Sequence, residues 1–202
     1  MEKVLDGRRI AMLATDGFEQ SELFEPLRAL KRAGAEVDIV SLKKGKIKGW
    51  DKKAWGKTIE VTRTTQEADP TDYDGLVLPG GVMNPDKLRA DVTAVSFVKS
   101  FVQEKKPIAA ICHGPWTLIE AGGVVNRKMT SWPSLKTDLQ NAGATWVDQE
   151  VIVDRGLVTS RKPEDLAAFT QKMIEEFKET SQMDGTSRAS IEEMPELQRK
   201  VV

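Results

Sequence analysis

The sequence is poor in the residue types that build disulfides and zinc sites, because its 202 residues include one cysteine and one histidine. A single cysteine cannot form an internal disulfide. One cysteine and one histidine also cannot supply the four protein ligands of a structural zinc ion. We therefore expect no structural metal and no cofactor.

Long apolar runs and an excess of one charge are also absent. The 30 basic residues nearly balance the 31 acidic ones, so the net charge of -1 offers no electrostatic attraction toward nucleic acid or anionic membranes. The early apolar run Ile10 to Ala14 is far shorter than the roughly 20 residues of a membrane span, and it lacks the features of a signal peptide. We predict a cytoplasmic protein with one domain and without nucleic-acid or membrane partners.

Short apolar segments alternate with helical patterns in the first half of the chain, which predicts a doubly wound α/β sandwich with a mostly parallel sheet. The segment from Lys43 to Val61 is rich in glycine, lysine and tryptophan and has no clear period, so we expect a hairpin outside the main sheet. The predicted strands are 9–14, 36–42, 73–79 and 107–111, and the predicted helices are 20–32 and 91–104.

The second half continues with predicted helices over 116–121 and 133–141, a hairpin over 150–160, and a long helix from Pro163 to about Lys178. The remaining segment, Ser181 to Val202, is polar and reads as a loose tail. We therefore expect one domain over 1–180 and an extension over 181–202, which we expect to pack on a neighbouring subunit.

The only cysteine, Cys112, directly precedes the only histidine, His113, between an apolar strand and Gly114-Pro115. A strand followed by one residue and a helix start is the layout of a nucleophile elbow, whose strained turn lifts one side chain over the sheet edge. The helix N-terminus there would lower the pKa of the thiol. A lone cysteine more often only packs in the core and does not react. Packing alone, however, would not require a cysteine at the end of a strand beside the only histidine.

The role of His113 stays open between two alternatives, because adjacent residues of a regular element point in different directions. The imidazole could bend back and be oriented by a third group, or the residue could contribute its backbone N–H to an oxyanion site. Gly80 and Gly81 could also direct N–H groups toward an oxyanion, although such a pair is often only a tight turn. Trp116 and Trp132 could line a pocket or could pack in the core.

Five segments together resemble the PfpI family of intracellular cysteine peptidase-like proteins, which belongs to the glutamine amidotransferase-like superfamily. The resemblance extends in order from about Arg9 to Lys178 and implies a flavodoxin-like sandwich. The segments are DGFEQSE (16–22), LVLPGG (76–81), AAICHGPWTLIEAGG (109–123), NAGATWVDQEVIVD (141–154) and LVTSRKPEDL (157–166).

The resemblance also implies roles for four residues. The nucleophile of the family falls on Cys112 and its neighbouring histidine on His113. The acid that hydrogen-bonds the thiol falls on Glu19, although Glu22 one turn later could take that role. The acid that orients the histidine comes from a neighbouring subunit in the family and falls on Asp86, where this sequence has one extra residue between PGG and the proline.

The function implied is that of a cysteine-dependent stress-defence enzyme, in which Cys112 attacks an electrophilic carbonyl. Superfamily members are described as peptidases, glyoxalases and deglycases, and we favour a small carbonyl or glycated substrate. Two alternatives remain, an intracellular cysteine peptidase and a non-enzymatic redox sensor or chaperone-like protein that uses oxidation of Cys112. A glutamine amidotransferase is disfavoured because no histidine follows His113. We expect a homo-oligomer, a dimer or a hexamer, with the site near a subunit interface.

Overall fold

A seven-stranded sheet forms the centre of the molecule in the computed structural model, which describes residues 3–192. Its order is β10-β11-β7-β6-β1-β2-β5, and all neighbours are parallel except the antiparallel edge pair β10 and β11. The strands are β1 (Arg9–Leu13), β2 (Glu36–Ser41), β5 (Arg63–Thr64), β6 (Gly75–Leu78), β7 (Ile108–Ile111), β10 (Val151–Asp154) and β11 (Leu157–Ser160).

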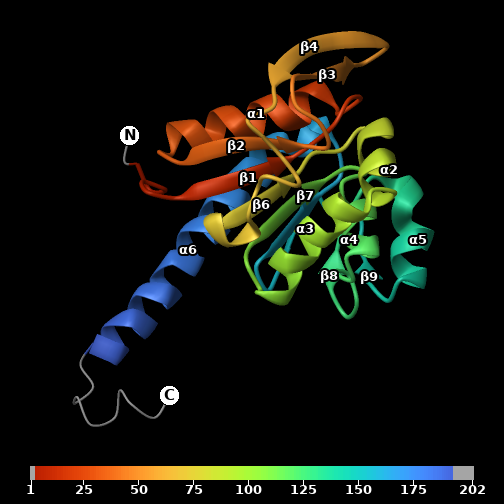
Figure 1. Cartoon of the computed structure of the whole chain (residues 1–202). Helices are drawn as coiled ribbons and strands as arrows, with labels where there is room; N and C mark the ends of the chain where they lie inside the picture. The colour runs from red at the N-terminus through yellow and green to blue at the C-terminus, as the bar shows by residue number, and fades with distance from the viewer. Residues whose placement is uncertain (1–2, 193–202) are drawn as a thin grey trace.

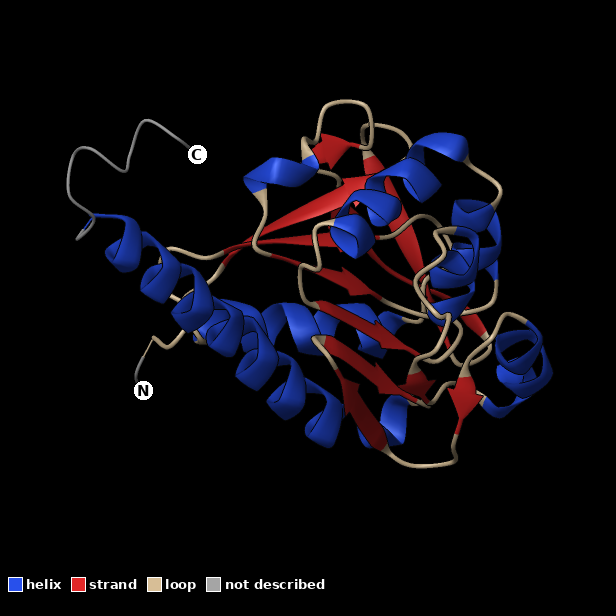
Figure 2. Ribbon diagram, turned by 90° about the horizontal axis from the view of Figure 1, so that it is seen from below, coloured by secondary structure: helices blue, strands red, loops and turns tan. Residues whose placement is uncertain are grey.

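Helices cover both faces of this sheet, which confirms the predicted doubly wound sandwich (Figures 1 and 2). Helices α1 and α6 pack together on one face, and α2, α3 and α4 pack together on the other. The α-helices are α1 (Gln20–Arg32), α2 (Met83–Arg89), α3 (Val92–Gln103), α4 (Pro115–Glu120), α5 (Lys136–Asn141) and α6 (Leu166–Glu192). Short 3-10 turns are η1 (Pro70–Asp72), η2 (Pro133–Leu135) and η3 (Pro163–Asp165).

Alternating side chains of the buried strands divide the core into two layers. In β1, Ile10 and Met12 pack toward α1 and α6, whereas Ala11 and Leu13 pack toward α3 and α4. All four of these side chains are inaccessible to solvent. A strand buried on both faces reads as a continuous apolar run, which is why the sequence predicts it well.

A separate two-stranded hairpin, β3 (Lys46–Asp51) and β4 (Ala54–Glu60), lies beyond the end of the main sheet, as predicted for 43–61 (Figure 1). Its first strand is anchored to the loop after β1, because Trp50 donates its backbone N–H to the carbonyl of Phe18 at 2.7 Å. A second small pair, β8 (Lys128–Met129) and β9 (Thr145–Trp146), was not predicted.

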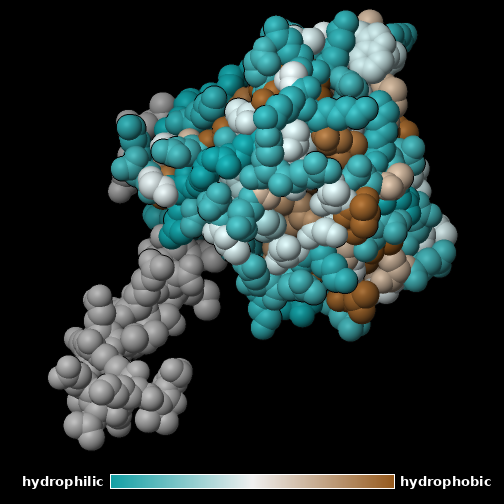
Figure 3. Space-filling view, viewed as in Figure 1, coloured by the Kyte–Doolittle hydropathy of each residue, from teal (hydrophilic) through white to brown (hydrophobic). Residues whose placement is uncertain are grey.

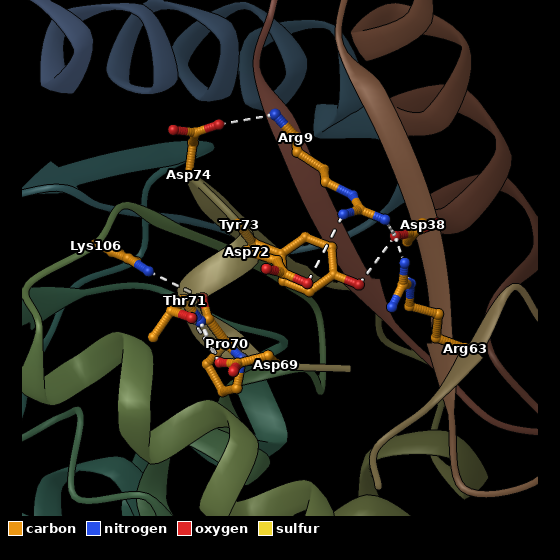
Figure 4. A network of polar contacts seen from close by, with 10 residues as sticks. All are labelled: Arg9, Asp38, Arg63, Asp69, Pro70, Thr71, Asp72, Tyr73, Asp74 and Lys106. Atoms are coloured by element: carbon orange, nitrogen blue, oxygen red, sulfur yellow. Dashed lines mark hydrogen bonds and ion pairs between the residues drawn. The ribbon is translucent and has the colours of Figure 1, made fainter. Parts of the chain in front are cut away.

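A polar network ties the first two strands to the segment before β6 (Figure 4). The Tyr73 hydroxyl and the Arg9 guanidinium both donate to Asp38, at 2.9 and 2.8 Å. Burial favours the neutral acid, but these two donors outweigh it and hold the pKa of Asp38 below its ordinary value. The network lies in the half of the fold away from Cys112, and its role is to stabilise the packing of β1, β2 and β6.

The long C-terminal helix differs from its prediction. It runs to Glu192 rather than ending near Lys178, and it projects away from the sheet (Figure 1). Its first half is held by the buried side chains of Phe169, Met173 and Phe177. Residues 193–202 of the predicted extension lie outside the described residues, and its packing on a neighbouring subunit stays a prediction. Over 3–192, the structure has no helix with the length and apolar character needed to cross a bilayer.

Candidate active site

Cys112 occupies a strained turn between a strand and a helix. Strand β7 ends at Ile111, α4 begins at Pro115, and the Cys112 φ angle is 62°. This left-handed conformation costs a non-glycine residue on the order of 1 kcal/mol or more. Two hydrogen bonds hold the turn, because Cys112 N–H donates to the Ser160 carbonyl at 3.0 Å and its carbonyl accepts from Trp132 N–H at 2.9 Å.

The carboxyl beside the Cys112 thiol belongs to Glu22. Its side chain is inaccessible to solvent, its Oε2 atom accepts a hydrogen bond from Gly80 N–H at 2.9 Å, and the carboxyl interacts with the thiol. Its Oε1 atom has no hydrogen-bond partner among the described residues. Burial raises the pKa of Glu22 to about 8, with a further contribution from Glu19. At neutral pH the carboxyl is therefore protonated and has an O–H group to donate.

Glu19 does not occupy the position that the resemblance implied for it. It precedes α1, and its Oε1 accepts a hydrogen bond from the Ser21 hydroxyl at 3.3 Å. Burial raises the pKa of this half-buried carboxyl as well. The alternative, Glu22, is the acid that meets the thiol, because it lies one turn into the helix on the face that packs against the sheet.

The thiol differs from the prediction in its acidity. Cys112 is only 7% exposed, and burial together with Glu22 raises the pKa of the thiol above its ordinary value. The backbone N–H groups of Gly81 and His113 interact with the sulfur and favour the thiolate, but burial outweighs them. The thiol is therefore protonated at neutral pH, and its activation requires a base.

The His113 imidazole lies beside the thiol within the same chain, contrary to the expectation for adjacent residues. Its Nδ1 atom lies 3.2 Å from Cys112 Sγ, because the left-handed turn brings the neighbouring side chains together. Burial lowers the pKa of His113 to about 4, so the ring is neutral at neutral pH. The other nitrogen, Nε2, lies 3.5 Å from the Ser134 hydroxyl.

Both predicted tryptophans contact the histidine ring. Trp116 meets it edge to face at a centroid distance of 5.2 Å, and Trp132 stacks on it at 6.0 Å. Trp132 lines the cleft and is 39% exposed, whereas the Trp116 indole N–H is occupied by a hydrogen bond to Asp138. The Trp132 ring is thus partly exposed in the cleft, whereas Asp138 fixes the orientation of the Trp116 ring.

The N–H groups of the glycine pair after β6 contact the carboxyl and the thiol of the site, Gly80 that of Glu22 and Gly81 that of Cys112, and their role at an oxyanion stays a prediction. Gly80 donates its N–H to Glu22, and a Cβ added to Gly80 would lie 2.6 Å from the Cβ of Cys112. The loop is held by the buried Asn84, which no sequence motif singled out. Its amide donates to the Pro79 and Gly80 carbonyls at 2.9 and 3.1 Å, and its Oδ1 accepts from Thr15 N–H at 2.8 Å.

Asp86 lies on the first turn of α2, and its side chain is exposed. It makes no hydrogen bond or ion pair to His113, whose only polar side-chain neighbours within the described chain are Cys112 and Ser134. An acid supplied to a neighbouring subunit would have to be exposed in this way. The assignment of Asp86 stays a prediction, because it depends on a second copy of the chain.

A cleft of about 390 Å³ opens beside the thiol. It adjoins a second cleft of about 540 Å³, and Glu19, Pro163 and Glu164 line both. Lys162 also lines the first cleft and was missed, although its place just after a predicted strand was a usable signal. Over residues 3–192, no three His, Cys, Asp or Glu side chains are grouped so that they could hold a metal ion.

The fold and this site define an α/β sandwich protein that presents a cysteine at the carboxyl end of a central strand. The model of the DJ-1/PfpI family matches residues 8–176, and the chain belongs to that family. This finding confirms the resemblance stated from the sequence, and it covers the sheet and every residue of the site described above.

Individual relatives carry stress-protein and deglycase names. General stress protein 18 of Bacillus subtilis is 43% identical over 170 residues, covering 83% of this chain and 96% of the relative. Deglycase TK1284 of Thermococcus kodakarensis is 42% identical over 166 residues, covering 82% and 97%. A solved two-domain protein of Anabaena variabilis with DJ-1/ThiJ/PfpI-like and ferritin-like domains superposes with a TM-score of 0.79 and 36% identity, covering 83% of this chain and 47% of that chain.

Proposed function

We propose that this protein is a cysteine-dependent enzyme of stress defence that acts on reactive carbonyl compounds and their early adducts with amines. The observation that carries the proposal is the grouping of a thiol, a neutral imidazole and a protonated carboxyl at one cleft. A base and an acid on the two sides of a nucleophile are what addition to a carbonyl requires. The stress-protein and deglycase names of relatives agree with this chemistry.

The first step forms a hemithioacetal. As Cys112 Sγ attacks the aldehyde carbon, the thiol proton passes to His113 Nδ1, which lies 3.2 Å away. The carbonyl π electrons move to oxygen, and this oxygen takes the proton of the Glu22 carboxyl. Because both groups are neutral before the step, the buried site holds no separated charges until the new bond forms, and the imidazolium and carboxylate that then appear leave its net charge at zero.

The following steps convert a 2-oxoaldehyde into a 2-hydroxy acid without an external oxidant. The Glu22 carboxylate removes the proton from the hemithioacetal carbon, and a proton is returned to the neighbouring carbon through an enediol. The result is a thioester, which water hydrolyses to release the acid and regenerate the thiol. When the aldehyde carbon already carries an amine nitrogen as a hemiaminal, Cys112 Sγ replaces that nitrogen and gives its proton to His113. The C–S bond forms as the C–N bond breaks, the electron pair stays on nitrogen, and nitrogen takes the Glu22 proton, which releases the free amine and leaves the same hemithioacetal.

The clefts support an adduct attached to a larger molecule as well as a free aldehyde. The first cleft has room for a small carbonyl beside Cys112, and the second continues from it past Glu19 and Glu164. An amine-bearing chain could occupy the second cleft while its carbonyl adduct reaches the sulfur. The peptidase alternative stays a prediction, because none of these contacts favours amide hydrolysis over carbonyl chemistry.

The redox-sensor alternative rests on one observation. The Oε1 atom of Glu22 is buried, lacks a partner among the described residues and belongs to a carboxyl that touches the sulfur. If a peroxide oxidised Cys112 to the sulfinic acid, the protonated carboxyl would donate a hydrogen bond to the new sulfinate oxygen. Mass spectrometry after mild peroxide treatment, compared between wild type and Glu22→Gln, would detect this preference as accumulation of sulfinate only in wild type.

The carbonyl proposal is tested by supplying methylglyoxal to the wild-type protein and to Cys112→Ser and following lactate. We expect lactate from wild type and a loss of more than about a thousandfold in the variant, because a neutral imidazole deprotonates a serine hydroxyl far less readily than a thiol. Equal background rates in the two proteins would reject carbonyl chemistry at this cysteine. Circular dichroism of both proteins excludes unfolding as the cause of a loss.

The geometry of the same site is the basis on which we propose a homo-oligomer. No acid in the described chain hydrogen-bonds the His113 ring, and Asp86 is exposed, so a second copy would complete the orientation of the ring. Light scattering of wild type, together with activity of Asp86→Asn, tests this. A monomer with full activity would remove both the interface and the role of Asp86.

A further inference from the structure

Each nitrogen of the His113 ring faces one polar side chain. Nδ1 lies 3.2 Å from Cys112 Sγ, Nε2 lies 3.5 Å from Ser134 Oγ, and within residues 3–192 the ring has no other hydrogen-bond partner. A neutral imidazole carries one N–H group, so one of its nitrogens donates and the other accepts. The function proposed above requires a free electron pair on Nδ1. The position of this single proton therefore decides whether His113 can act as the base.

The buried thiol determines the direction of the hydrogen bond at Nδ1. Burial and the neighbouring Glu22 raise the pKa of Cys112 above its ordinary value, so the sulfur keeps its proton at neutral pH. A thiol is a weak acceptor, whereas the unprotonated nitrogen of an imidazole is an ordinary one. The S–H group therefore donates to Nδ1, and the proton of the neutral ring lies on Nε2. This N–H group needs an acceptor, and Ser134 Oγ is the one within reach among the described side chains.

Two tryptophans keep the ring from exchanging these contacts. A half turn of the ring would put carbon atoms in the places of both nitrogens. Trp132 stacks on the ring at 6.0 Å between centroids, and Trp116 meets it edge to face at 5.2 Å. Trp116 is itself held, because its indole N–H donates to Asp138 at 2.8 Å and the Arg89 guanidinium lies 5.5 Å from the centroid of its ring. The ring therefore keeps one orientation, and the position of its proton is what remains to be set.

Ser134 belongs to the hydrogen-bonded turn that holds Cys112. It lies in η2, and the residue before η2, Trp132, donates its N–H to the Cys112 carbonyl at 2.9 Å. Leu135 closes the turn by donating its N–H to the Trp132 carbonyl at 3.0 Å, and its side chain is inaccessible to solvent. These bonds set the place of Ser134 beside the ring before any substrate binds. The residue is exposed, so its own O–H group can donate to water.

We propose that Ser134 is a positioning residue, which accepts the Nε2–H of His113 and thereby keeps Nδ1 unprotonated for the thiol proton of Cys112. The inference rests on the proposed function for the role of the ring as base. When the C–S bond forms, the thiol proton moves to Nδ1 and the ring becomes a cation. The bond from Nε2–H to the hydroxyl then becomes charge-assisted and shortens from 3.5 Å. A hydroxyl suits this role because it stabilises the cation without charging the ring beforehand, as a carboxylate would do.

The test compares Ser134→Val with Ser134→Thr, because the two side chains have the same shape and only threonine keeps the hydroxyl. His113 is the only histidine, so NMR of the ring nitrogens in protein without a histidine tag reports which of them carries the proton, with no substrate present. We expect the proton on Nε2 in wild type and in Ser134→Thr. In Ser134→Val the fraction with the proton on Nδ1 should rise about fivefold, the scale of one lost hydrogen bond.

Kinetics supply a second measurement. Because the cation exists only after the proton has moved, kcat for methylglyoxal should fall roughly tenfold in Ser134→Val relative to Ser134→Thr, while KM stays within about twofold. Ser96→Val makes the same change at an exposed serine of α3, on the largely hydrophilic face seen in Figure 3, and should match wild type in both measurements. If wild type forms no lactate, the proposed chemistry fails, but the NMR comparison still decides the role of Ser134.

Ser134→Asp provides a check in the opposite direction. A carboxylate in place of the hydroxyl should stabilise the imidazolium and raise the pKa of His113 above its wild-type value of about 4. The same NMR signals, followed against pH, measure this change. An unchanged pKa would show that residue 134 does not reach the ring and would contradict the proposal.

Three further outcomes would overturn the proposal. One is a proton on Nδ1 in the wild-type ring. Another is the same distribution of the proton and the same kcat in Ser134→Val and Ser134→Thr, which would mean that the hydroxyl has no effect. The third is a shifted proton in Asp86→Asn but not in Ser134→Val, which would assign the orientation of the ring to an acid of a second copy. Circular dichroism of each variant separates these outcomes from misfolding.

Discussion

The turn at Cys112 and the β3–β4 hairpin both border the same cleft, yet they are built in opposite ways. The turn is buried, its ionisable groups are neutral at pH 7, and its backbone is held in a strained conformation. The hairpin is exposed, densely charged and free of contacts at most of its ammonium groups among the described residues. Chemistry at a buried site depends on a few atoms in fixed positions, whereas recognition by an exposed surface is spread over many weak contacts. Substitutions should therefore act sharply in the first region and gradually in the second.

Among substitutions that leave the cysteine in place, the largest effect is expected at the buried acid. Glu22→Gln preserves the size of the side chain but removes the proton that the carbonyl oxygen takes, so we expect kcat/KM for methylglyoxal to fall by roughly a hundredfold. Glu19→Gln is the matched control, since Glu19 makes its hydrogen bond to Ser21 rather than to the thiol. It should keep activity within about threefold. Equal losses in the two variants would return the role to Glu19.

The second effect is a loss of stability and activity that a steric clash would cause. Gly80→Ala would place a Cβ 2.6 Å from the Cβ of Cys112, so the loop must move and the free energy of unfolding should fall by about 2 to 4 kcal/mol, together with activity. Gly45→Ala, before β3, meets no atom within 4 Å and carries only the strain of its φ of 100°, about 1 kcal/mol. Urea unfolding of both variants measures the difference. Similar losses would show that the loop at Gly80 adapts freely.

Most of the fold could be predicted from the sequence, because the sequence patterns that indicate its strands and helices are local. The buried strands are apolar runs, the helix over 20–32 carries leucines on one face, and glycines and prolines mark the boundaries. Helix α2 was missed because its seven residues include Pro85 and show no apolar period. The extent of α6 was missed because a polar composition resembles that of a tail.

The residue types of the site could be predicted from the sequence, but their geometry could not. The position of Cys112 at a strand end followed from the pattern, whereas its contact with His113 arises from a left-handed φ that breaks the rule for adjacent residues. Glu19 and Glu22 were both candidates, and only the packing of α1 on the sheet decides which carboxyl is buried. The pKa of the thiol depends on burial, which outweighs the helix N-terminus expected to lower it.

The third effect is a pH dependence of stability. The folded pKa of Glu22 is about 8, above its ordinary value of 4.5, so the unfolded chain releases this proton at lower pH than the folded chain. Glu22 therefore lowers the free energy of unfolding as pH rises from 4.5 to 8. Between pH 5 and 7 the loss amounts to about 2 kcal/mol, and Glu22→Gln should remove it. Urea unfolding at the two pH values measures the difference between wild type and variant, in which other titrating groups cancel. A parallel dependence in both proteins would mean that Glu22 is ionised in the fold.

The smallest effect separates the two regions most directly. Lys52→Glu/Lys57→Glu reverses two charges on the hairpin. Both side chains line the second cleft, but neither lines the cleft of Cys112, and methylglyoxal is a small, uncharged molecule. The kcat/KM for methylglyoxal should therefore stay within about twofold of wild type, because exposed charges act weakly through water and salt. Lactate formation measured at low and high salt provides the check. A large, salt-sensitive change would show that the hairpin charges reach the buried thiol, and the division between a buried chemical site and an exposed charged hairpin would then be wrong.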